Sequence, residues 1–563
     1  MKNVSKYTKG YYLPPESEKY NNWVKRTTID KAPTWCSVDL RDGNQSLIVP
    51  MTLQEKLDFF NFLVKIGFKE IEVGFPAASE TEYEFCRALI EKNLIPDDVA
   101  IQVLTQSREH IIRKTFDALR GAKNAIVHFY NSTSVVQREQ VFKKSKDEIT
   151  NIAVTGATLI KQLANEYEGN FRFEYSPESF TGTEPEYGLE ICNAVLEILE
   201  PTPDNKVIIN LPATVEVSLP HVFANQVEYM CANLHKRENV VVSLHAHNDR
   251  GCAVAATELG LLAGADRVEG TLFGNGERTG NTDIITVALN MYSQGVEPGL
   301  DFSNISEVVD IYERVTDLDV HARHPYSGEL VFAAFSGSHQ DAIAKGMAHR
   351  EKLLETNSSC VWNVPYLPID PSDVGRKYDS DVIRVNSQSG KGGIGHILER
   401  YGYNLPPEMR ESVGYAIKDL SDKENKELSP DDVLTAFLEM FKNVKKKIRL
   451  KKAKYYEDPE KRYNSDLQIE DLETNIIHTI SGSGVGYLDA ICNALKKHLN
   501  IEFDVGFQMQ TSMKDAGAKS QAIAYVEIID KDGNGHWGMG LRTNTTNANA
   551  TAVVSAINRS GLI

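Results

Sequence analysis

Long apolar runs are absent from this chain of 563 residues, and cysteine is scarce. No stretch approaches the roughly twenty apolar residues that a membrane-spanning helix needs. The first six residues, MKNVSK, lack the apolar segment of a signal peptide, so secretion is not expected. The seven cysteines include no Cys-X-X-Cys pair, which is typical of reduced thiols. We therefore expect a cytoplasmic protein with no membrane partner.

Positive charge is also in short supply, because 61 Lys and Arg face 78 Asp and Glu and leave a net charge of -17. Nucleic-acid binding depends on positive charge that faces phosphate, so this composition argues against a nucleic-acid partner. The chain is too long for one ordinary core, and two to four domains are expected.

Between about residues 34 and 295 the sequence alternates between short apolar runs and amphipathic segments. The segment LQEKLDFF at residues 53–60, for example, has apolar residues at helical spacing. Eight strand-then-helix units in about 260 residues match the size of a (β/α)₈ barrel, an α/β fold with a parallel sheet. A doubly wound open sheet is the alternative. The apolar runs are residues 34–39, 70–75, 100–105, 124–130, 170–175, 206–210, 240–245 and 267–272.

Polar residues follow six of these eight runs. A single polar residue after a run is explained by a solvated loop or a helix cap. Polar residues after six of the eight runs are too many for that explanation. In a barrel, catalytic groups lie where strands end and loops begin. The candidates are Arg41 and Asp42 after the first run, His128 and Tyr130 at the fourth, Ser176 and Glu178 at the fifth, Asn210 and Thr214 at the sixth, His245 and His247 at the seventh, and Asn281 after the eighth.

The seventh run ends in HAHND at residues 245–249. Residues two apart in a strand project to the same side, so His245 and His247 present two imidazoles side by side. For this pattern alone, a pair of ordinary half-buried histidines is the alternative to metal ligands. Asp42 offers an oxygen ligand, and the Asn281 carbonyl can add a fourth group. Such a mixed set suits Mg²⁺, Mn²⁺ or Zn²⁺ in an open catalytic site.

Arg41, next to Asp42, offers donors for a carboxylate or for a developing alkoxide. An open metal site polarises a ketone and orients a neighbouring carboxylate. Together these groups predict a 2-oxo acid bound through its keto and carboxylate oxygens. Residue spacing goes no further than this.

Several motifs, in order along nearly the whole chain, resemble the α-isopropylmalate synthases. These belong to the acyl-CoA-dependent Claisen-condensing barrels, with the homocitrate and citramalate synthases. The resemblance is to the longer branch of the family. The motifs are DLRDGNQ at 39–45, YSPES at 175–179, HAHND at 245–249, GNGERTGN at 274–281, SGSHQD at 336–341, VPYLPID at 364–370 and VNSQSGKGG at 385–393.

The resemblance implies condensation of acetyl-CoA with 2-oxoisovalerate, the committed step of leucine biosynthesis. By position it makes Asp42, His245 and His247 metal ligands, with Asn281 near the metal. Arg41 and Thr214 would hold the oxo acid, while His128, Tyr130, Ser176 and Asn210 would line the pocket for its side chain. Glu178 and His339 would form the acid/base pair, with Tyr366 close by.

Past residue 325 the repeat stops. We expect an N-terminal extension over residues 1–30, a catalytic barrel over 31–325, mainly helical linker subdomains over 326–465 and an α+β regulatory-type domain over 466–563. Within these, helices are predicted at 333–348, 429–444, 488–499 and 548–560, strands at 469–481, 522–530 and 536–543, a solvated basic linker at 445–454 and a Gly-rich phosphate cradle at 386–393.

The family places a leucine-binding domain at the C-terminus, so leucine is a candidate effector. The turn GSGVGYLDA at residues 482–490 departs from the family's common Gly-Pro pair. His339 lies beyond the barrel, and we expect it to enter the site of the partner subunit in a two-fold homodimer.

Three other functions compete with this prediction. A homocitrate or citramalate synthase would share the barrel. A metal-dependent hydrolase of the amidohydrolase type would carry the His-X-His pair on its first strand, not its seventh. A non-catalytic sensing barrel would have lost Arg41, Asp42 or Glu178, and all three are present.

Overall fold

The computed structural model describes residues 6, 12–17, 20–334, 336–356, 361–378, 391–424, 428–512 and 521–563. The chain separates into two compact units, Met1–Val331 with Ile369–Lys377 and Phe332–Pro368 with Tyr378–Ile563, and each is described by itself. Among the described residues, no helix has the length and apolar character needed to cross a membrane.

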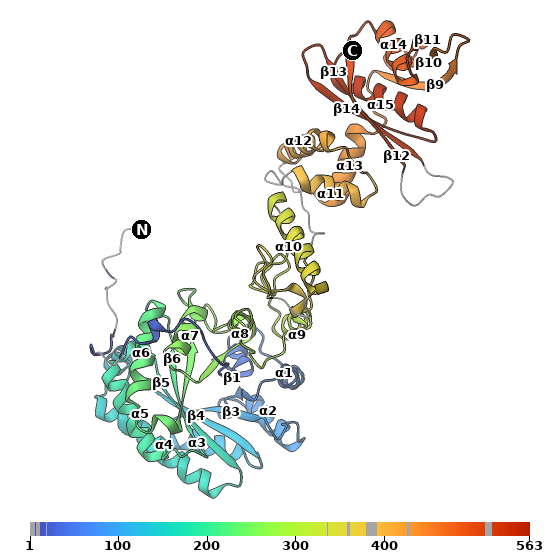
Figure 1. Cartoon of the computed structure of the whole chain (residues 1–563). Helices are drawn as coiled ribbons and strands as arrows, with labels where there is room; N and C mark the ends of the chain where they lie inside the picture. The colour runs from blue at the N-terminus through green and yellow to red at the C-terminus, as the bar shows by residue number, and fades with distance from the viewer. Residues whose placement is uncertain are drawn as a thin grey trace. The chain divides into compact units, whose positions relative to one another are not determined.

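The first unit is a closed barrel of parallel strands in sequence order, surrounded by helices (Figure 1). The alternative of an open doubly wound sheet is therefore wrong. All predicted strands are confirmed to within a few residues, because strands buried on both faces appear in the sequence as continuous apolar runs. They are β1 Thr34–Ser37, β2 Glu70–Gly74, β3 Ala100–Gln106, β4 Asn124–Ser132, β5 Asn170–Glu178, β6 Val207–Ala213, β7 Val240–Ala246 and β8 Arg267–Gly270.

Four of the helices described in this unit begin at a residue whose side chain caps the helix. In the first of them, Thr52 and Glu55 form a capping box, and Gly67 ends the helix in the left-handed conformation that glycine adopts without strain. The helices are α1 Leu53–Ile66, α2 Glu80–Glu91, α3 Glu109–Ala118, α4 Lys146–Glu166, α5 Pro185–Leu199, α6 Pro220–Asn233, α7 Ala253–Leu262, α8 Ile284–Tyr292 and α9 Ile305–Thr316.

The interior of the barrel contains a buried arginine among carboxylates. Arg267, on β8, is fully buried. Its Nε lies 2.6 Å from a Glu70 oxygen, and its Nη1 lies 2.8 Å from Glu269 and 3.2 Å from Glu174. Its Nη2 donates to the amide oxygen of Gln102 at 2.7 Å. A buried charge needs such partners, so these contacts constrain how the strands that carry them are paired.

The second unit contains helices α10 to α15 and two antiparallel three-stranded sheets, ordered β11-β10-β9 and β12-β13-β14. The predicted helices and the strands at 522–530 and 536–543 are confirmed, with ends shifted by up to eight residues. The elements are α10 Gly337–Thr356, α11 Lys391–Arg400, α12 Pro407–Glu424, α13 Pro430–Phe441, β9 Ile448–Glu457, β10 Tyr463–Asp471, β11 Ile477–Gly484, α14 Tyr487–Leu499, β12 Phe503–Ser512, β13 Ala522–Asp530, β14 Gly535–Arg542 and α15 Thr545–Ser560.

Two predictions for this unit are wrong. The single strand predicted at 469–481 is a hairpin, in which Asp471 ends β10 and its side chain accepts hydrogen bonds from the backbone of Glu473 and Thr474. The basic segment at 445–454 is not a solvated linker, because most of it lies in β9, which pairs with β10. The many lysines of this segment made it resemble a charged linker. It is a half-buried strand whose Leu450, Ala453 and Tyr455 pack on the core.

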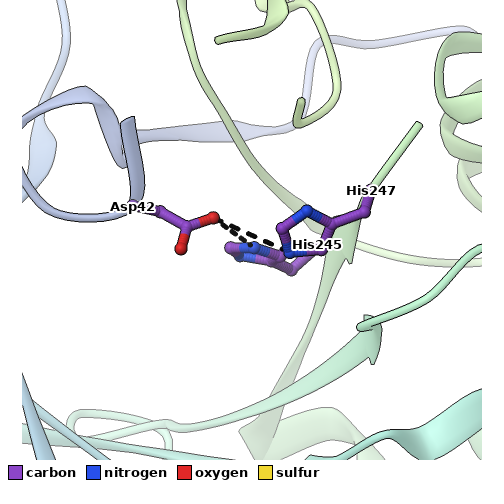
Figure 2. A group of neighbouring side chains, drawn as sticks. All are labelled: Asp42, His245 and His247. Atoms are coloured by element: carbon purple, nitrogen blue, oxygen red, sulfur yellow. Dashed lines mark ion pairs between the residues drawn. The ribbon is translucent and has the colours of Figure 1, made fainter. Parts of the chain in front are cut away.

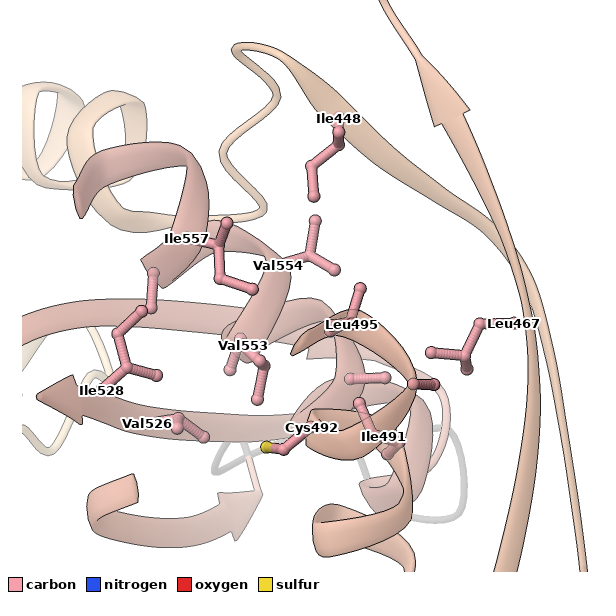
Figure 3. Packing of buried hydrophobic residues seen from close by; sticks show 14 of the residues in the cluster. Ile448, Leu467, Ile491, Cys492, Leu495, Val526, Ile528, Val553, Val554 and Ile557 are labelled. Carbon is pink, nitrogen blue, oxygen red and sulfur yellow. The ribbon is translucent and has the colours of Figure 1, made fainter. Parts of the chain in front are cut away.

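That core lies between the sheets and the helices α14 and α15 (Figure 3). The helix α15 approaches β14 closely because Gly538 and Gly540 have no side chains. A Cβ atom at either glycine would collide with the backbone of α15, at Ala552 and Ala548 respectively. The contact therefore depends on the absence of a methyl group.

We predict that Arg267→Met destabilises the barrel by about 3–5 kcal/mol, because it leaves buried carboxylates without a counter-charge. The measurement is thermal unfolding, and the midpoint should fall by roughly 5–10 °C. The matched control is Arg113→Met, which breaks an exposed pair with Glu109 on α3 and should change the midpoint little. Equal midpoints for the two variants would contradict the structural role of Arg267.

Candidate active site

Two strand ends bring together the three predicted metal ligands. Asp42 lies in a wide, π-type turn, Asp39–Gly43, that follows β1. His245 lies on β7 and His247 directly after it, and their side chains lie on the same side (Figure 2). Their Nε2 atoms lie 3.4 and 3.7 Å from the same oxygen of Asp42, Oδ2. All three side chains are buried.

The donor set fits a divalent cation. Asp42 Oδ2 and Asn281 Oδ1 are buried without a hydrogen-bond partner among the described residues. Asn281 lies beside His247, since the two form a β-bridge. Buried polar atoms are rarely left unpaired, and a carboxylate, imidazoles and an amide oxygen are ligands that Mg²⁺, Mn²⁺ and Zn²⁺ accept.

The electrostatics keep the carboxylate ionised. Burial raises the pKa of Asp42, but Arg41, whose Nη1 lies 2.6 Å from Oδ1, overcomes this and holds that pKa well below its usual range. Burial lowers the pKa of His245, but its contacts with Asp42 and Glu269 raise it to about 9. For His247, burial followed by repulsion from His245 lowers the pKa to about 4.

Glu269 orients the ring of His245. Its carboxylate lies 2.7 Å from Nδ1, so Nε2 faces Asp42. Glu269 is itself held by Arg267 and by the amide of Gln102, each at 2.8 Å. An outer partner of this kind fixes the tautomer of a metal-binding histidine.

A second group of possible ligands, Glu72, His128 and Glu269, lies deeper in the barrel. Here the Gln102 amide nitrogen already donates to Glu72 and Glu269 at 2.8 Å and lies 3.3 Å from His128 Nδ1. This group is therefore a hydrogen-bonded core and not a second cation site.

The ligands open into a cavity of about 450 Å³ at the carboxyl ends of the strands. All the substrate-binding candidates predicted in the barrel, together with Glu178, line it. The lining residues are Arg41, Asp42, Gln45, Phe75, Leu104, His128, Tyr130, Ser176, Glu178, Asn210, Pro212, Thr214, His245, His247, Glu277 and Arg278. Asn281 does not appear on this wall.

Hydrogen bonds fix the polar floor of this cavity. His128 Nδ1 lies 2.7 Å from Glu72, and Nε2 lies 2.8 Å from the Ser176 hydroxyl. Asn210 donates to the same hydroxyl at 3.0 Å. Gln106 donates to the Tyr130 hydroxyl at 3.1 Å. The floor is therefore rigid, and few of its donors are left for a charged ligand.

Sequence reasoning missed part of the wall. Phe75 and Leu104 belong to apolar runs, where nothing separates a cavity residue from a core residue. Arg278 and Glu277 stand within the recognised motif at 274–281, but no role was assigned to them. Arg278 pairs with Asp249 at 2.7 Å, and its side chain is 41 % exposed.

Two of the predicted acid/base residues lie in the second unit and one in the first. His339, on α10, stacks on Tyr366 with ring centroids 4.1 Å apart, so these two predicted neighbours do lie together. Glu178 ends β5 in the first unit and accepts a hydrogen bond from the Ser132 hydroxyl. Residues 385–390 of the motif at 385–393 lie outside the described residues. Most of the predicted phosphate cradle at 386–393 therefore also lies outside them.

Comparisons with known proteins agree with this geometry. Three families match in succession: HMGL-like over residues 32–311, "Alpha-isopropylmalate synthase, post-catalytic domain-like" over 329–399, and "LeuA allosteric (dimerisation) domain" over 427–560. The chain is 59 % identical to the 2-isopropylmalate synthase of Helicobacter hepaticus, over 99 % of this chain and 100 % of that protein. It is 56 % identical to that of Desulfitobacterium hafniense, over 99 % and 98 %, and 52 % identical to that of Clostridium acetobutylicum, over 99 % and 100 %.

A closed (β/α)₈ barrel that gathers a carboxylate and two imidazoles around a cavity at the carboxyl ends of its strands has the architecture of a barrel enzyme. With relatives this similar over its whole length, the chain belongs to the 2-isopropylmalate synthase family.

We predict that Mn²⁺ binding at this site releases about one proton between pH 5 and 8. A histidine binds a metal ion only when its imidazole is neutral. His245, whose pKa is raised to about 9, must lose a proton, whereas His247, at about 4, is already neutral. Affinity should therefore fall about tenfold for each unit by which the pH is lowered.

The measurement is calorimetric titration in two buffers of different ionisation enthalpy. Asp42→Ala is the control, which should lose Mn²⁺ binding while keeping its circular-dichroism spectrum. Binding with no proton release would contradict the assignment of His245 as a ligand.

Proposed function

We propose that this protein condenses acetyl-CoA with 2-oxoisovalerate and water to give 2-isopropylmalate and CoA, the committed step of leucine biosynthesis. The observation that carries the proposal is the cavity in which Arg41 and the group Asp42, His245 and His247 converge. The names of the relatives support the same activity.

A divalent cation held by Asp42, His245 and His247, with Asn281 nearby, would polarise the ketone and orient its carboxylate. Mg²⁺ or Mn²⁺ is our first choice because the set includes hard oxygen donors, and Zn²⁺ is the alternative. Arg41 supplies a fixed positive charge for the alkoxide that forms at the former keto oxygen.

Thr214 would bind the carboxylate of the oxo acid. Its hydroxyl oxygen already accepts a hydrogen bond from the Ser179 backbone at 2.8 Å, which leaves its own proton available to donate. The side chain of the substrate would lie among His128, Tyr130, Ser176 and Asn210.

We propose that Glu178 and His339 form the acid/base pair, with Tyr366 beside the imidazole. A base removes a proton from the acetyl methyl group, and the resulting enolate carbon attacks the keto carbon. The keto oxygen becomes an alkoxide and takes up a proton. Water then cleaves the thioester, which releases CoA as the thiol and leaves the second carboxylate of the product.

This cavity should prefer a short branched side chain to a second carboxylate. Arg41 is already paired with Asp42 and Glu72, and Arg278 with Asp249. We predict that kcat/KM for 2-oxoisovalerate exceeds that for 2-oxoglutarate by at least about a hundredfold, since a buried unpaired carboxylate costs several kcal/mol.

The measurement is thiol release from acetyl-CoA with a panel of 2-oxo acids at saturating metal. Pyruvate serves as the control for a small side chain and tests a citramalate synthase. A preference for 2-oxoglutarate would favour a homocitrate synthase and contradict the proposal.

We further propose a two-fold homodimer in which His339 of each chain enters the site of the other. The match of residues 427–560 to a dimerisation domain supports the dimer. A two-fold interface exchanges such segments reciprocally, so that each site gains one.

If the sites are shared, mixing His339→Ala with Glu178→Ala protein should restore activity. A hybrid dimer then contains one doubly defective site and one intact site, so up to about a quarter of the wild-type rate is expected from a statistical mixture. The measurement is turnover after co-refolding, and two different affinity tags on the two variants, recovered in tandem, show that hybrid dimers form. Hybrids that form but stay inactive would place His339 in the site of its own chain.

Leucine is our proposed effector at the C-terminal sheets. There Tyr487, at the start of α14, makes edge-to-face contacts with Tyr455 and Tyr463, at centroid distances of 5.7 and 4.9 Å. This aromatic cluster offers an apolar surface of the kind that an aliphatic side chain packs against.

A further inference from the structure

A buried ion pair lies behind the turn that carries Arg41 and Asp42. Lys56, on α1, is fully buried, and its ammonium group pairs with the carboxylate of Glu82 on α2. Burial lowers the pKa of Lys56, which Glu82 opposes. A lysine ammonium is seldom buried unless it is paired and hydrogen-bonded, so this position calls for a reason beyond packing.

The ammonium also contacts the turn itself. Lys56 Nζ donates to the backbone carbonyl of Leu40 at 3.4 Å, and Leu40 directly precedes Arg41. The turn, Asp39–Gly43, is of the π type, which is uncommon and frequent at functional sites. At its start, Asp39 accepts a hydrogen bond from the backbone of Leu272 at 3.0 Å. The turn is thus held from two sides.

The partner carboxylate reaches a second segment of the cavity wall. Glu82 Oε2 accepts a hydrogen bond from the backbone of Phe75 at 3.2 Å, and Phe75 lines the cavity. Gly74 has a φ of +154°, and a Cβ there would collide with Glu82. Glycine at position 74 therefore leaves room for the carboxylate of Glu82 next to Phe75.

We propose that Lys56 and Glu82 are positioning residues, which join the Arg41–Asp42 turn to the Phe75 wall and hold Asp42 where it can bind the metal. Neither side chain lines the cavity, so neither touches substrate. The inference rests on the metal site proposed above. A buried pair outside the cavity, with one member on α1 and the other on α2, thus positions one proposed metal ligand and one part of the cavity wall.

The first test is Lys56→Met, which keeps the length of the side chain and removes its charge. Mn²⁺ affinity, measured by calorimetry without oxo acid or acetyl-CoA, should weaken about tenfold or more, as for other outer-shell losses. At saturating Mn²⁺, kcat should fall while KM for acetyl-CoA changes little. The control is Arg237→Met, which removes a partly buried pair with Asp266 at the opposite end of the strands. It should lower thermal stability without changing Mn²⁺ affinity.

A second variant separates positioning from simple destabilisation. In Lys56→Met/Glu82→Gln the unpaired charge is gone, and the amide oxygen can still accept from Phe75. Thermal stability should return toward that of wild type, while Mn²⁺ affinity stays about tenfold weakened because Leu40 still lacks its donor.

Recovery of both stability and Mn²⁺ affinity in the double variant would overturn the proposal, as would a Lys56→Met protein that binds Mn²⁺ like wild type. If the wild-type protein itself binds no Mn²⁺, the proposed metal site is wrong and the positioning role falls with it. If wild type binds Mn²⁺ and the Lys56 variants bind it equally well, only the positioning role is wrong.

Discussion

The barrel depends on the neutralisation of charge at its centre. Arg267 is the cation around which Glu70, Glu174 and Glu269 gather, and these residues come from different strands. Charge inside a protein is stable only with partners in good geometry, so the guanidinium limits how the strands can be arranged. Burial, followed by repulsion from Glu269, raises the pKa of Glu174 well above its usual value, while the nearby Arg267 opposes that rise.

From this centre a continuous set of contacts leads to the reacting end. Glu269 joins Arg267 to His245, and His245 faces Asp42. Arg41 then joins Asp42 to Glu72. The amide nitrogen of Gln102 donates to both Glu72 and Glu269, so the contacts form a closed ring. Because each member has two or more partners, the effects of substitutions here should be strongly non-additive.

The barrel could be predicted from the sequence because its strands are buried on both faces and appear as uninterrupted apolar runs. The histidine pair could be predicted because strand geometry repeats every two residues. Strand β9 could not, since its lysines alternate with half-buried apolar residues and resemble a charged linker. Phe75 and Lys56 could not either. Lys56 contacts Leu40 and Glu82 through its ammonium group, and Glu82 accepts a hydrogen bond from the backbone of Phe75. These contacts join different elements of the fold, so no local pattern encodes them.

The absence of side chains at Gly538 and Gly540 has an evolutionary consequence. Five positions, these two and Ala548, Ala552 and Ala556 on α15, share one narrow space. A larger residue at one glycine is tolerated only if the helix moves, and a moved helix no longer fits the remaining positions. Their substitutions are therefore conditional on one another. Across related chains these positions should vary together or not at all, even where the surrounding surface diverges freely.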